Sequence, residues 1–360
     1  REAMTIFVSG DSEYSKDSDV TLLDYLRNYL ELRGTKYMCR EGGCGACIVS
    51  AAKGRGEPHL AVNSCLVSIA SCHNWDITTV EKVGNRKDGY HPIQDTLARY
   101  NGTQCGYCTP GWVMSMYSNK RMSELDIENS FGSNICRCTG YRSILEAFKQ
   151  FSSDKPKPIQ IPDIEDLKIC RKTGSECNKT NCEDESEWCF VTKENFSSIL
   201  EIHLKDGKFW YRVSTLRDVF HILMVRGIDS YMLVAGNTAK GVYPIDDYPS
   251  VLIDVTGVFE LQGCVLDQNL IIGAGNTLTR VWELFDRFKN IEGFHYLQAL
   301  YDHLQLVAHT PVRNVGTLAG NLMIKHAHNE FPSDIYLLLD TVDARLTICE
   351  YAKFLQAEKH

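Results

Sequence analysis

The sequence predicts an α+β protein of several domains. Two quartets of closely spaced cysteines occupy the first 140 residues, and strand-like and helix-like segments alternate from about residue 188 onward. A proline-rich and acidic segment, residues 152–187, separates these regions and is typical of a linker. At 360 residues, the chain is long enough for two or three domains with separate hydrophobic cores.

Composition and charge are those of an ordinary globular protein. Hydrophobic residues make up 44%, charged residues 23%, and the net charge is −8. This mildly acidic balance argues against nucleic acid or an anionic membrane as a partner. No run of residues approaches the ~20 apolar residues of a membrane span, and the N-terminus has no apolar signal region. We therefore expect a cytoplasmic protein without a membrane partner, with the peroxisome as the alternative location.

The first quartet has the spacing Cys-x4-Cys-x2-Cys, with a fourth cysteine 18 positions further on. That spacing is the arrangement of plant-type [2Fe–2S] clusters, in which thiolates ligate the irons. Three glycines in the same loop permit positive φ angles and bring backbone N–H groups close to sulfur, which stabilises a reduced cluster. The loop lies in a predicted small sheet with one helix at residues 21–32 and a strand at 48–52. The quartet consists of Cys39, Cys44, Cys47 and Cys65.

The second quartet lies in a predominantly helical segment. Helices are predicted at residues 92–100, 111–119 and 141–151, and Ser123 with Asp126 forms a capping-box pattern for another. A bundle of four short helices can hold a cluster between two cysteine pairs. The chain has fifteen cysteines, an odd number, and several of them are closely spaced in pairs. This pattern fits metal ligation in a reducing compartment better than a secreted disulfide scaffold. The quartet consists of Cys105, Cys108, Cys136 and Cys138.

Two further groups of residues have metal-ligand chemistry but poor spacing. The linker cysteines match no common zinc site, so we interpret them as unligated thiols. His326 and His328 lack further ligands nearby, and we interpret them as solvated or locally hydrogen-bonded side chains. The linker cysteines are Cys170, Cys177, Cys182 and Cys189.

The region after the linker reads as an α+β domain. We predict a buried strand at residues 231–235, strands at 251–255 and 270–273, and helices at 281–288 and 294–307. The region contains neither the dinucleotide fingerprint G-x-G-x-x-G nor a P-loop lysine. Each of its glycine turns is weak evidence alone, but two turns with Asn and Thr offer donors to a pyrophosphate. These turns begin at Gly236 and Gly316.

Taken together, these segments resemble the xanthine dehydrogenase/aldehyde oxidase family of molybdo-flavoenzymes. The resemblance runs over roughly residues 4–348, and its clearest motifs surround the cysteines. It is closest to insect aldehyde oxidases, through residues 321–328 and the linker segment 168–174. The motifs that carry the resemblance are Glu41-Gly42-Gly43-Cys44-Gly45-Ala46-Cys47, residues 103–111, residues 134–142, residues 233–238 and residues 316–321.

The resemblance implies a fold for each part of the chain. Residues 4–75 are expected to form a plant-ferredoxin-like β-grasp domain, and residues 76–151 a four-helix [2Fe–2S] bundle domain. Residues 188–350 are expected to form an α+β FAD-binding domain of the vanillyl-alcohol-oxidase/CO-dehydrogenase flavoprotein type, incomplete at its C-terminal side.

The resemblance also implies cofactor contacts, with two [2Fe–2S] clusters ligated by the quartets. Gln104 and Cys138 would contact the molybdopterin, and no catalytic residue is expected in this chain. The expected FAD contacts are Leu233, Val234, Ala235, Gly236, Asn237, Thr238, Ala239, Lys240, Thr317, Leu318, Ala319, Gly320, Asn321 and Asp334.

The implied function is electron transfer within an aldehyde oxidase-like molybdenum hydroxylase, which oxidises an aldehyde or N-heterocycle. Val307 takes a position near the flavin that is often aromatic in the dehydrogenases, which favours O2 over NAD as acceptor. Residues 349–360 do not align, and the molybdenum region would follow further along. We therefore expect no hydroxylation by this chain alone, and a homodimer at full length.

Three alternatives remain open. In the first alternative, the chain is a fragment of a xanthine dehydrogenase that uses NAD. In the second, it is a truncated, non-catalytic paralogue that binds clusters or partners only. In the third alternative, it is a separate electron-transfer subunit that docks onto a molybdenum-containing chain. Formation of NADH from a purine would identify the dehydrogenase. Loss of FAD with retention of both clusters would indicate the paralogue, and co-purification of a large subunit would indicate the separate subunit.

Overall fold

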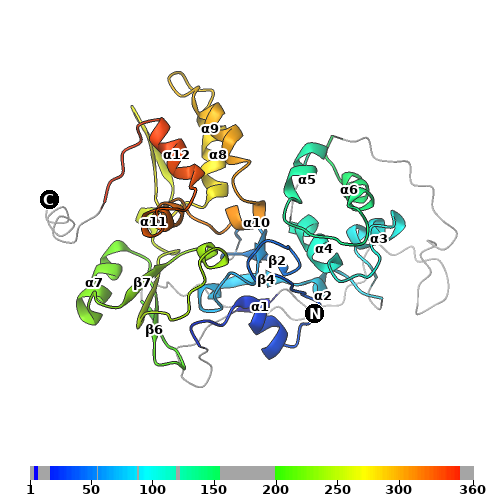
Figure 1. Ribbon diagram of the computed structural model, residues 1–360, viewed down its shortest axis with the longest axis horizontal. Helices are drawn as coiled ribbons and strands as arrows, with labels where there is room; N and C mark the ends of the chain where they lie inside the picture. Colours follow the sequence, from blue (N-terminus) through cyan, green and yellow to red (C-terminus); the bar gives the residue numbers. More distant parts are fainter. Residues whose placement is uncertain are drawn as a thin grey trace.

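The computed structural model describes residues 4–6, 17–54, 56–86, 89–118, 122–154 and 199–348. Figure 1 shows a small blue and cyan sheet in the middle, a group of cyan-green helices on one side, and a larger green-to-red part on the other. The four linker cysteines and residues 349–360 lie outside the described residues.

The central part is a four-stranded antiparallel sheet in the order β1-β4-β2-β3. Its core contains Leu22, Val49 and Ile77, all at most 1% exposed. Because β4 pairs with both β1 and β2, residues 76–78 belong to this sheet, although the sequence places them with the helices. The strands are β1 (Met4–Ile6), β2 (Ile48–Ala52), β3 (Leu60–Asn63) and β4 (Trp75–Thr78).

The helix predicted at residues 21–32 is shorter and partly irregular. It consists of α1 (Leu22–Asp24), which continues as a π-helical turn over Tyr25–Tyr29. The Leu30 amide donates to the Tyr25 carbonyl, and Glu31 follows with a φ of 55°. A positive φ ends a right-handed helix. The helix therefore ends at Tyr29, five residues before Gly34, which the sequence suggests as its end.

The second part is a bundle of short helices, as predicted. Its core is aromatic: Trp112 lies 5.1 Å from Phe131 and 6.2 Å from Phe148 between ring centroids. The capping box predicted at Ser123 is present, and His91 forms a second one. The elements are α2 (Val80–Val83), α3 (Pro92–Arg99), α4 (Thr109–Ser118), α5 (Glu124–Ser130) and α6 (Arg142–Lys149).

The third part contains a mixed sheet in the order β5-β6-β8-β7. β5 and β6 are antiparallel, whereas β8 runs parallel to both β6 and β7. The prediction of a buried strand at residues 231–235 is wrong in one respect: β7 is an edge strand, and Leu233 is 51% exposed. The strands are β5 (Leu200–His203), β6 (Phe209–Arg212), β7 (Tyr231–Val234) and β8 (Val251–Asp254).

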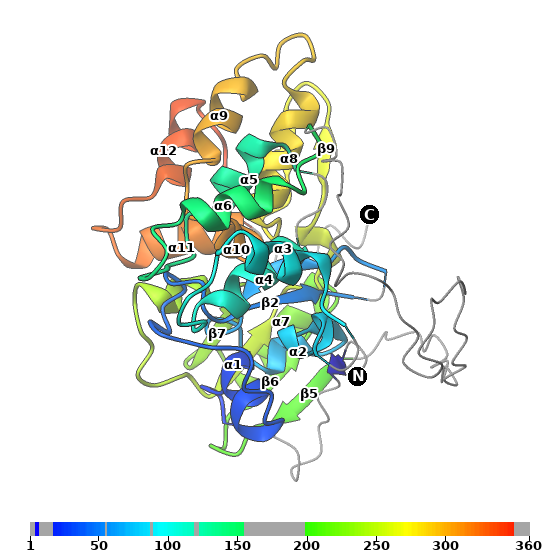
Figure 2. The same ribbon diagram turned by 90° about the vertical axis from the view of Figure 1, so that its right-hand side faces the viewer.

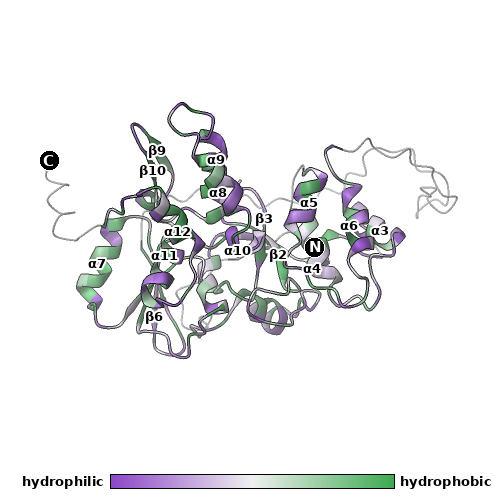
Figure 3. Ribbon diagram, turned by 45° about the horizontal axis from the view of Figure 1, so that its top comes forward, coloured by the Kyte–Doolittle hydropathy of each residue, from purple (hydrophilic) through white to green (hydrophobic). Residues whose placement is uncertain are grey.

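A helix follows β6 on this sheet. It is α7 (Leu216–Arg226), which begins at a Thr215 capping box and buries Val219 and Ile222. Figure 3 shows apolar residues along α7, and Met224 and Val225 are about two-thirds exposed.

The rest of the third part is a hairpin and a group of helices with one shared core. The α8 helix starts at Leu278, earlier than predicted, because Thr277 caps it. Figures 1 and 2 both show α8, α9 and α12 at the end of the molecule opposite α1. The elements are β9 (Cys264–Leu266), β10 (Leu270–Ile272), α8 (Leu278–Phe288), α9 (Leu297–Leu304), α10 (Thr310–Arg313), α11 (Leu318–Ala327) and α12 (Asp334–Thr341).

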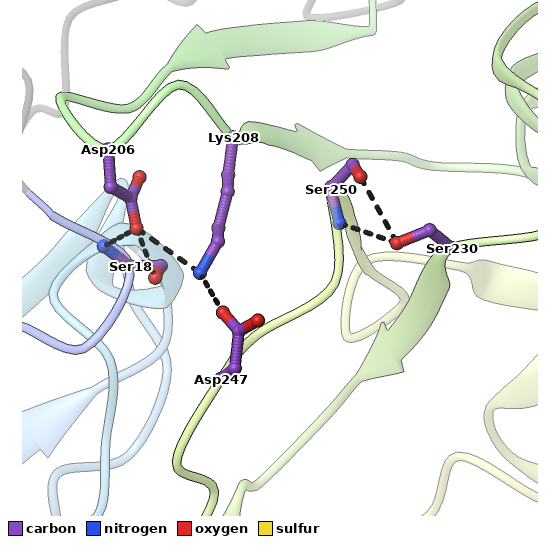
Figure 4. Close-up of polar contacts among 6 residues, drawn as sticks. All are labelled: Ser18, Asp206, Lys208, Ser230, Asp247 and Ser250. Atoms are coloured by element: carbon purple, nitrogen blue, oxygen red, sulfur yellow. Dashed lines mark hydrogen bonds and ion pairs between the residues drawn. The ribbon is translucent and has the colours of Figure 1, made fainter.

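The central sheet domain and the third part are joined by polar contacts at the β5–β6 turn (Figure 4). Ser18 donates to the Asp206 carboxylate from both its backbone N and its Oγ, at 3.3 and 2.6 Å. Lys208 Nζ lies 3.6 Å from Asp206 and 3.0 Å from Asp247. These contacts hold the turn against the segment that leads into α1.

No described helix is both long and apolar enough to cross a membrane.

Candidate iron–sulfur and flavin sites

The structure brings the first quartet together as two pairs of thiols. Cys39 lies within hydrogen-bonding reach of Cys44, and Cys47 of Cys65. Cys44, Cys47 and Cys65 are buried, and Cys39 is partly exposed. Contact with Cys47, and then burial, strongly raises the pKa of Cys65. Burial opposes ionisation of Cys39, but amide groups of the loop together lower its pKa.

The second quartet spans the bundle surface. Cys108 and Cys136 contact each other, and burial followed by this contact raises the pKa of Cys108 to about 12. Cys105 and Cys138 are exposed. Cys105 and Cys108 precede α4, while Cys136 and Cys138 precede α6, so each pair lies just before a helix starts.

The donor set fits [2Fe–2S] clusters. Each iron of such a cluster takes two cysteine thiolates. The structure provides three contacting pairs of thiols, two in the first quartet and one in the second. Within the described residues, no group of three or more Cys, His, Asp or Glu side chains is compact enough for a single metal ion. Thiolate pairs therefore suit a two-iron cluster better than a mononuclear site.

The loop of the first quartet packs directly against the bundle. A Cβ at Gly111 in α4 would lie 2.2 Å from the carbonyl oxygen of Gly45, so the helix can approach only through a glycine. The Ile135 amide donates to the Cys44 carbonyl at 3.0 Å. Since Ile135 precedes Cys136, a backbone hydrogen bond joins the loops of the two quartets.

The first glycine turn follows β7 and has unpaired backbone donors. Asn237 adopts a left-handed conformation with a φ of 53°, and a 3-10 turn over Thr238–Gly241 follows. Among the described residues, the amides of residues 236–239 have no acceptor. Consecutive N–H groups around such a turn form a concave anion site. Residues 233–240 can thus bind a pyrophosphate through the backbone.

The second glycine turn is built differently. The Leu318 and Ala319 amides donate to the carbonyls of Asn276 and Ala274, and the Gly320 amide donates to Thr317 Oγ1. These donors at the start of α11 are already used, so the turn supports its neighbour instead of offering its amides to a ligand. The two turns are in close contact, because a Cβ at Gly236 of the first turn would lie 1.9 Å from the oxygen of Val315, which precedes the second turn.

The first turn also contacts the first-quartet loop. Asn237 Nδ2 donates to the Leu66 carbonyl at 3.1 Å, next to Cys65. A Cβ at Gly241 would lie 2.5 Å from the Glu41 oxygen. The candidate anion site and the candidate cluster site are therefore neighbours.

The remaining predicted contact residues lie at the surface. Gln104 is exposed, as are Cys105 and Cys138. Asp334 begins α12, and its carboxylate lies 3.6 Å from His303 Nε2. The preceding residue, Ser333, donates to Asn321 Oδ1 at 2.5 Å and so connects α12 to the second turn.

His328, of the His326/His328 pair, makes local contacts. His328 stacks on Tyr243 with 3.7 Å between ring centroids, and it lies 3.5 Å from Glu330. His328 thus makes the local contacts that the sequence suggests for it.

Sequence reasoning missed a partly buried lysine between the central sheet and the third part. Lys53 extends from β2, and its Nζ donates to the Asn314 carbonyl at 3.1 Å. Burial lowers the pKa of Lys53 to about 8, which Asp254 partly offsets. The side chain lines a cavity of about 90 Å³ together with Gly236 and Thr317, beneath both glycine turns. In the sequence, Lys53 simply follows an apolar strand, and this local pattern does not indicate that its side chain packs between two domains.

This architecture, two cysteine quartets beside a backbone anion site, defines an iron–sulfur flavoprotein. Three family models match the chain: a 2Fe-2S iron-sulfur cluster binding domain at residues 6–70, a [2Fe-2S] binding domain at 79–149, and an FAD binding domain in molybdopterin dehydrogenase at 201–356. The chain belongs to the molybdo-flavoenzyme family that contains the xanthine dehydrogenases and aldehyde oxidases. Its cofactors are accordingly two [2Fe–2S] clusters and FAD.

Curated relatives of the chain include plant and insect proteins. Probable aldehyde oxidase 4 of Oryza sativa subsp. japonica is 32% identical over 387 residues, which covers 94% of this chain and 45% of the relative. Xanthine dehydrogenase of Drosophila subobscura is 34% identical over 384 residues, covering 96% of this chain and 28% of the relative. Indole-3-acetaldehyde oxidase of Zea mays is 32% identical, covering 92% and 26%. The chain thus spans less than half the length of these relatives.

Proposed function

We propose that the chain is the electron-transfer portion of an aldehyde oxidase-like molybdenum hydroxylase that oxidises aldehydes or N-heterocycles with O2 as acceptor. The contiguity of the three sites supports this proposal. The Ile135–Cys44 hydrogen bond links the two cluster loops, and Asn237 and Gly241 contact the first loop from the flavin side. Electrons would enter at the second cluster, pass to the first and leave at FAD.

In this proposal the thiol pairs divide between the irons. Cys39 and Cys44 would hold one iron of the first cluster, and Cys47 and Cys65 the other, because these side chains already contact each other. Cys108 and Cys136 would share an iron of the second cluster, which leaves Cys105 and Cys138 for its partner. The clusters carry one electron at a time, and the flavin accepts two.

The flavin contacts proposed from the sequence acquire different roles. Residues 233–240 would hold the pyrophosphate through the amides of residues 236–239. Thr317, Leu318, Ala319, Gly320 and Asn321 would support that turn, and Asp334 would contact FAD from the start of α12. The domain types proposed are the β-grasp, helical-bundle and vanillyl-alcohol-oxidase-like folds named above.

The molybdenum–molybdopterin cofactor would belong to a part of the enzyme outside these 360 residues. Gln104 and Cys138 are exposed at the bundle surface, where a pterin held by another domain could reach them. We assign no catalytic residue to this chain and propose that the complete enzyme is a homodimer.

Cofactor analysis of the purified chain tests the proposal. Two clusters require about four irons per chain, and the proposal expects one FAD and two distinct [2Fe–2S] signals in low-temperature EPR of the reduced protein. Iron for one cluster or none would contradict it. Retention of both clusters without FAD would instead favour a non-catalytic paralogue.

A xanthine dehydrogenase that uses NAD is the second candidate. The 34% identity to the Drosophila subobscura enzyme favours it, whereas Val307 at the position near the flavin favours an oxidase. The product of the complete gene decides between them. Aldehyde-dependent O2 consumption without NADH formation supports the oxidase, and NADH formation from a purine supports the dehydrogenase.

A further inference from the structure

The flavin-binding part contacts the first-cluster loop through a partly buried histidine ring. His309 Nε2 lies 2.7 Å from the carbonyl oxygen of Gly42. A carbonyl can only accept, so Nε2 must carry the proton and donate. Burial, the largest effect, lowers the pKa of His309, which keeps the ring neutral. Its Nδ1 is therefore an acceptor, and it is buried without a partner among the described residues.

The position of this ring is fixed from its own side. Arg313 NH1 donates to the carbonyls of Gln305, Val307 and Ala308, at 3.1, 2.9 and 3.0 Å. Ala308 has a φ of 52°, a strained conformation that turns the chain immediately before His309. The loop between α9 and α10 thus presents the histidine in one orientation.

The accepting carbonyl is fixed as well. Asn63 Nδ2, from the end of β3, donates to the same Gly42 oxygen at 3.1 Å. Gly42 has a φ of 79°, and a Cβ there would lie 2.7 Å from Leu66 Cδ1. Two donors therefore hold one peptide group at a position that only glycine fits.

The other end of that peptide group faces a cluster ligand. In a trans peptide, C=O and N–H point in opposite directions, so fixing the Gly42 oxygen also aims the Gly43 amide. The Glu41 amide donates to that ligand, the Cys39 sulfur, at 3.4 Å. Burial opposes ionisation of Cys39, whereas the neighbouring amides, Gly43 among them, favour the thiolate and lower the pKa of Cys39. Hydrogen bonds in series polarise one another. Donation by His309 therefore strengthens donation by Gly43 to the sulfur.

We infer that His309 is a positioning residue that raises the reduction potential of the first cluster through the Gly42–Gly43 peptide group. Hydrogen bonds to cluster sulfurs stabilise the more negative, reduced state. The residue belongs to the flavin-binding part and acts on a cluster ligated by another domain. It would thereby match the cluster potential to the acceptor that the same part carries.

Two uncharged variants of the full chain separate the effect of hydrogen-bond donation at position 309 from the effect of side-chain size. His309→Gln keeps an N–H donor at similar reach, whereas His309→Met has similar length and no donor. EPR-monitored redox titration of both clusters is the measurement. We expect a more negative first-cluster potential in H309M, a value near that of the unmodified chain in H309Q, and an unchanged second cluster in both.

Three results would overturn the inference. An unchanged first-cluster potential in H309M with full iron content removes the proposed effect. A parallel shift of both clusters indicates a general structural change. If H309M does not load its clusters, His309→Asn, too short to reach Gly42, takes its place, and failure of both variants assigns His309 a purely structural role. The readout needs no FAD, so it remains separate from the test of the proposed function.

Discussion

The Ile135 amide donates a 3.0 Å hydrogen bond to the carbonyl oxygen of Cys44. The two residues are 91 positions apart, yet one is a candidate ligand of the first cluster and the other precedes a ligand of the second. Asn134 Nδ2 adds a bond of 3.4 Å to the neighbouring Gly45 oxygen. Backbone groups and one side-chain amide thus build a short connection between the two cluster loops.

Substitution of Gly111 should weaken this connection. In G111A the new methyl group would lie 2.2 Å from the Gly45 oxygen, so α4 must move away from the cluster loop. Overpacking of this kind costs about 1–3 kcal/mol. We expect a lower free energy of unfolding in urea and a weaker magnetic interaction between the reduced clusters in EPR. G132A is the matched control, because its methyl group meets nothing within 4 Å; equal behaviour of both variants would contradict the prediction.

Substitution of Gly236 should impair flavin binding alone. In G236A the methyl group would overlap the Val315 oxygen at 1.9 Å and displace the turn that offers free amides. We expect a reduced flavin-to-iron ratio and a larger Kd for FAD, with both cluster signals retained. G54A, whose methyl group makes only an ordinary contact at 3.6 Å, is the control. Full FAD content in G236A would argue against this turn as the binding element.

Lys53 should make stability depend on pH in the alkaline range. Its pKa is lowered from 10.5 to about 8 in the folded state, so the unfolded chain binds more protons between these values. Stability from this group therefore rises with pH across that window and is lowest below pH 8. At neutral pH, holding this charge in the folded state costs about 3 kcal/mol of folding free energy. The reason is that lowering a pKa by one corresponds to about 1.4 kcal/mol.

Urea unfolding of the unmodified chain and K53M at pH 7.5, 8.5 and 9.5 measures this dependence. The unmodified chain should gain stability relative to K53M as the pH rises. K208M is the control: although desolvation opposes it, pairing with Asp247 and Asp206 raises the pKa of Lys208 above this window. A constant difference between the unmodified chain and K53M would refute the assignment.

Loss of one thiol should remove only the cluster that it ligates. C108S takes away a member of the contacting Cys108–Cys136 pair, and we expect the iron content to fall by about half with the first-cluster EPR signal intact. C264S, a cysteine outside both quartets, should keep all the iron. Loss of both signals in C108S would mean that the two sites do not form independently.

Local pattern predicted much of the fold. The strand at residues 48–52, the capping box at Ser123 and the four bundle helices depend on neighbouring residues, and the structure contains them. Predictions that depend on distant neighbours were less accurate. β7 has a hydrophobic sequence but lies at a sheet edge, and the helix after Thr21 ends early because Glu31 turns the chain.

The sequence by itself determined the two cysteine quartets and hence the iron–sulfur chemistry, because ligand spacing within a loop is a local property. It also indicated both glycine turns. Only the tertiary structure decided that one turn has unpaired amides while the other has used its own, since their acceptors come from distant segments. The same holds for Lys53 and for His309, which reaches a carbonyl 267 positions away. Burial and pairing across domains depend on how the chain packs, and no local pattern records them.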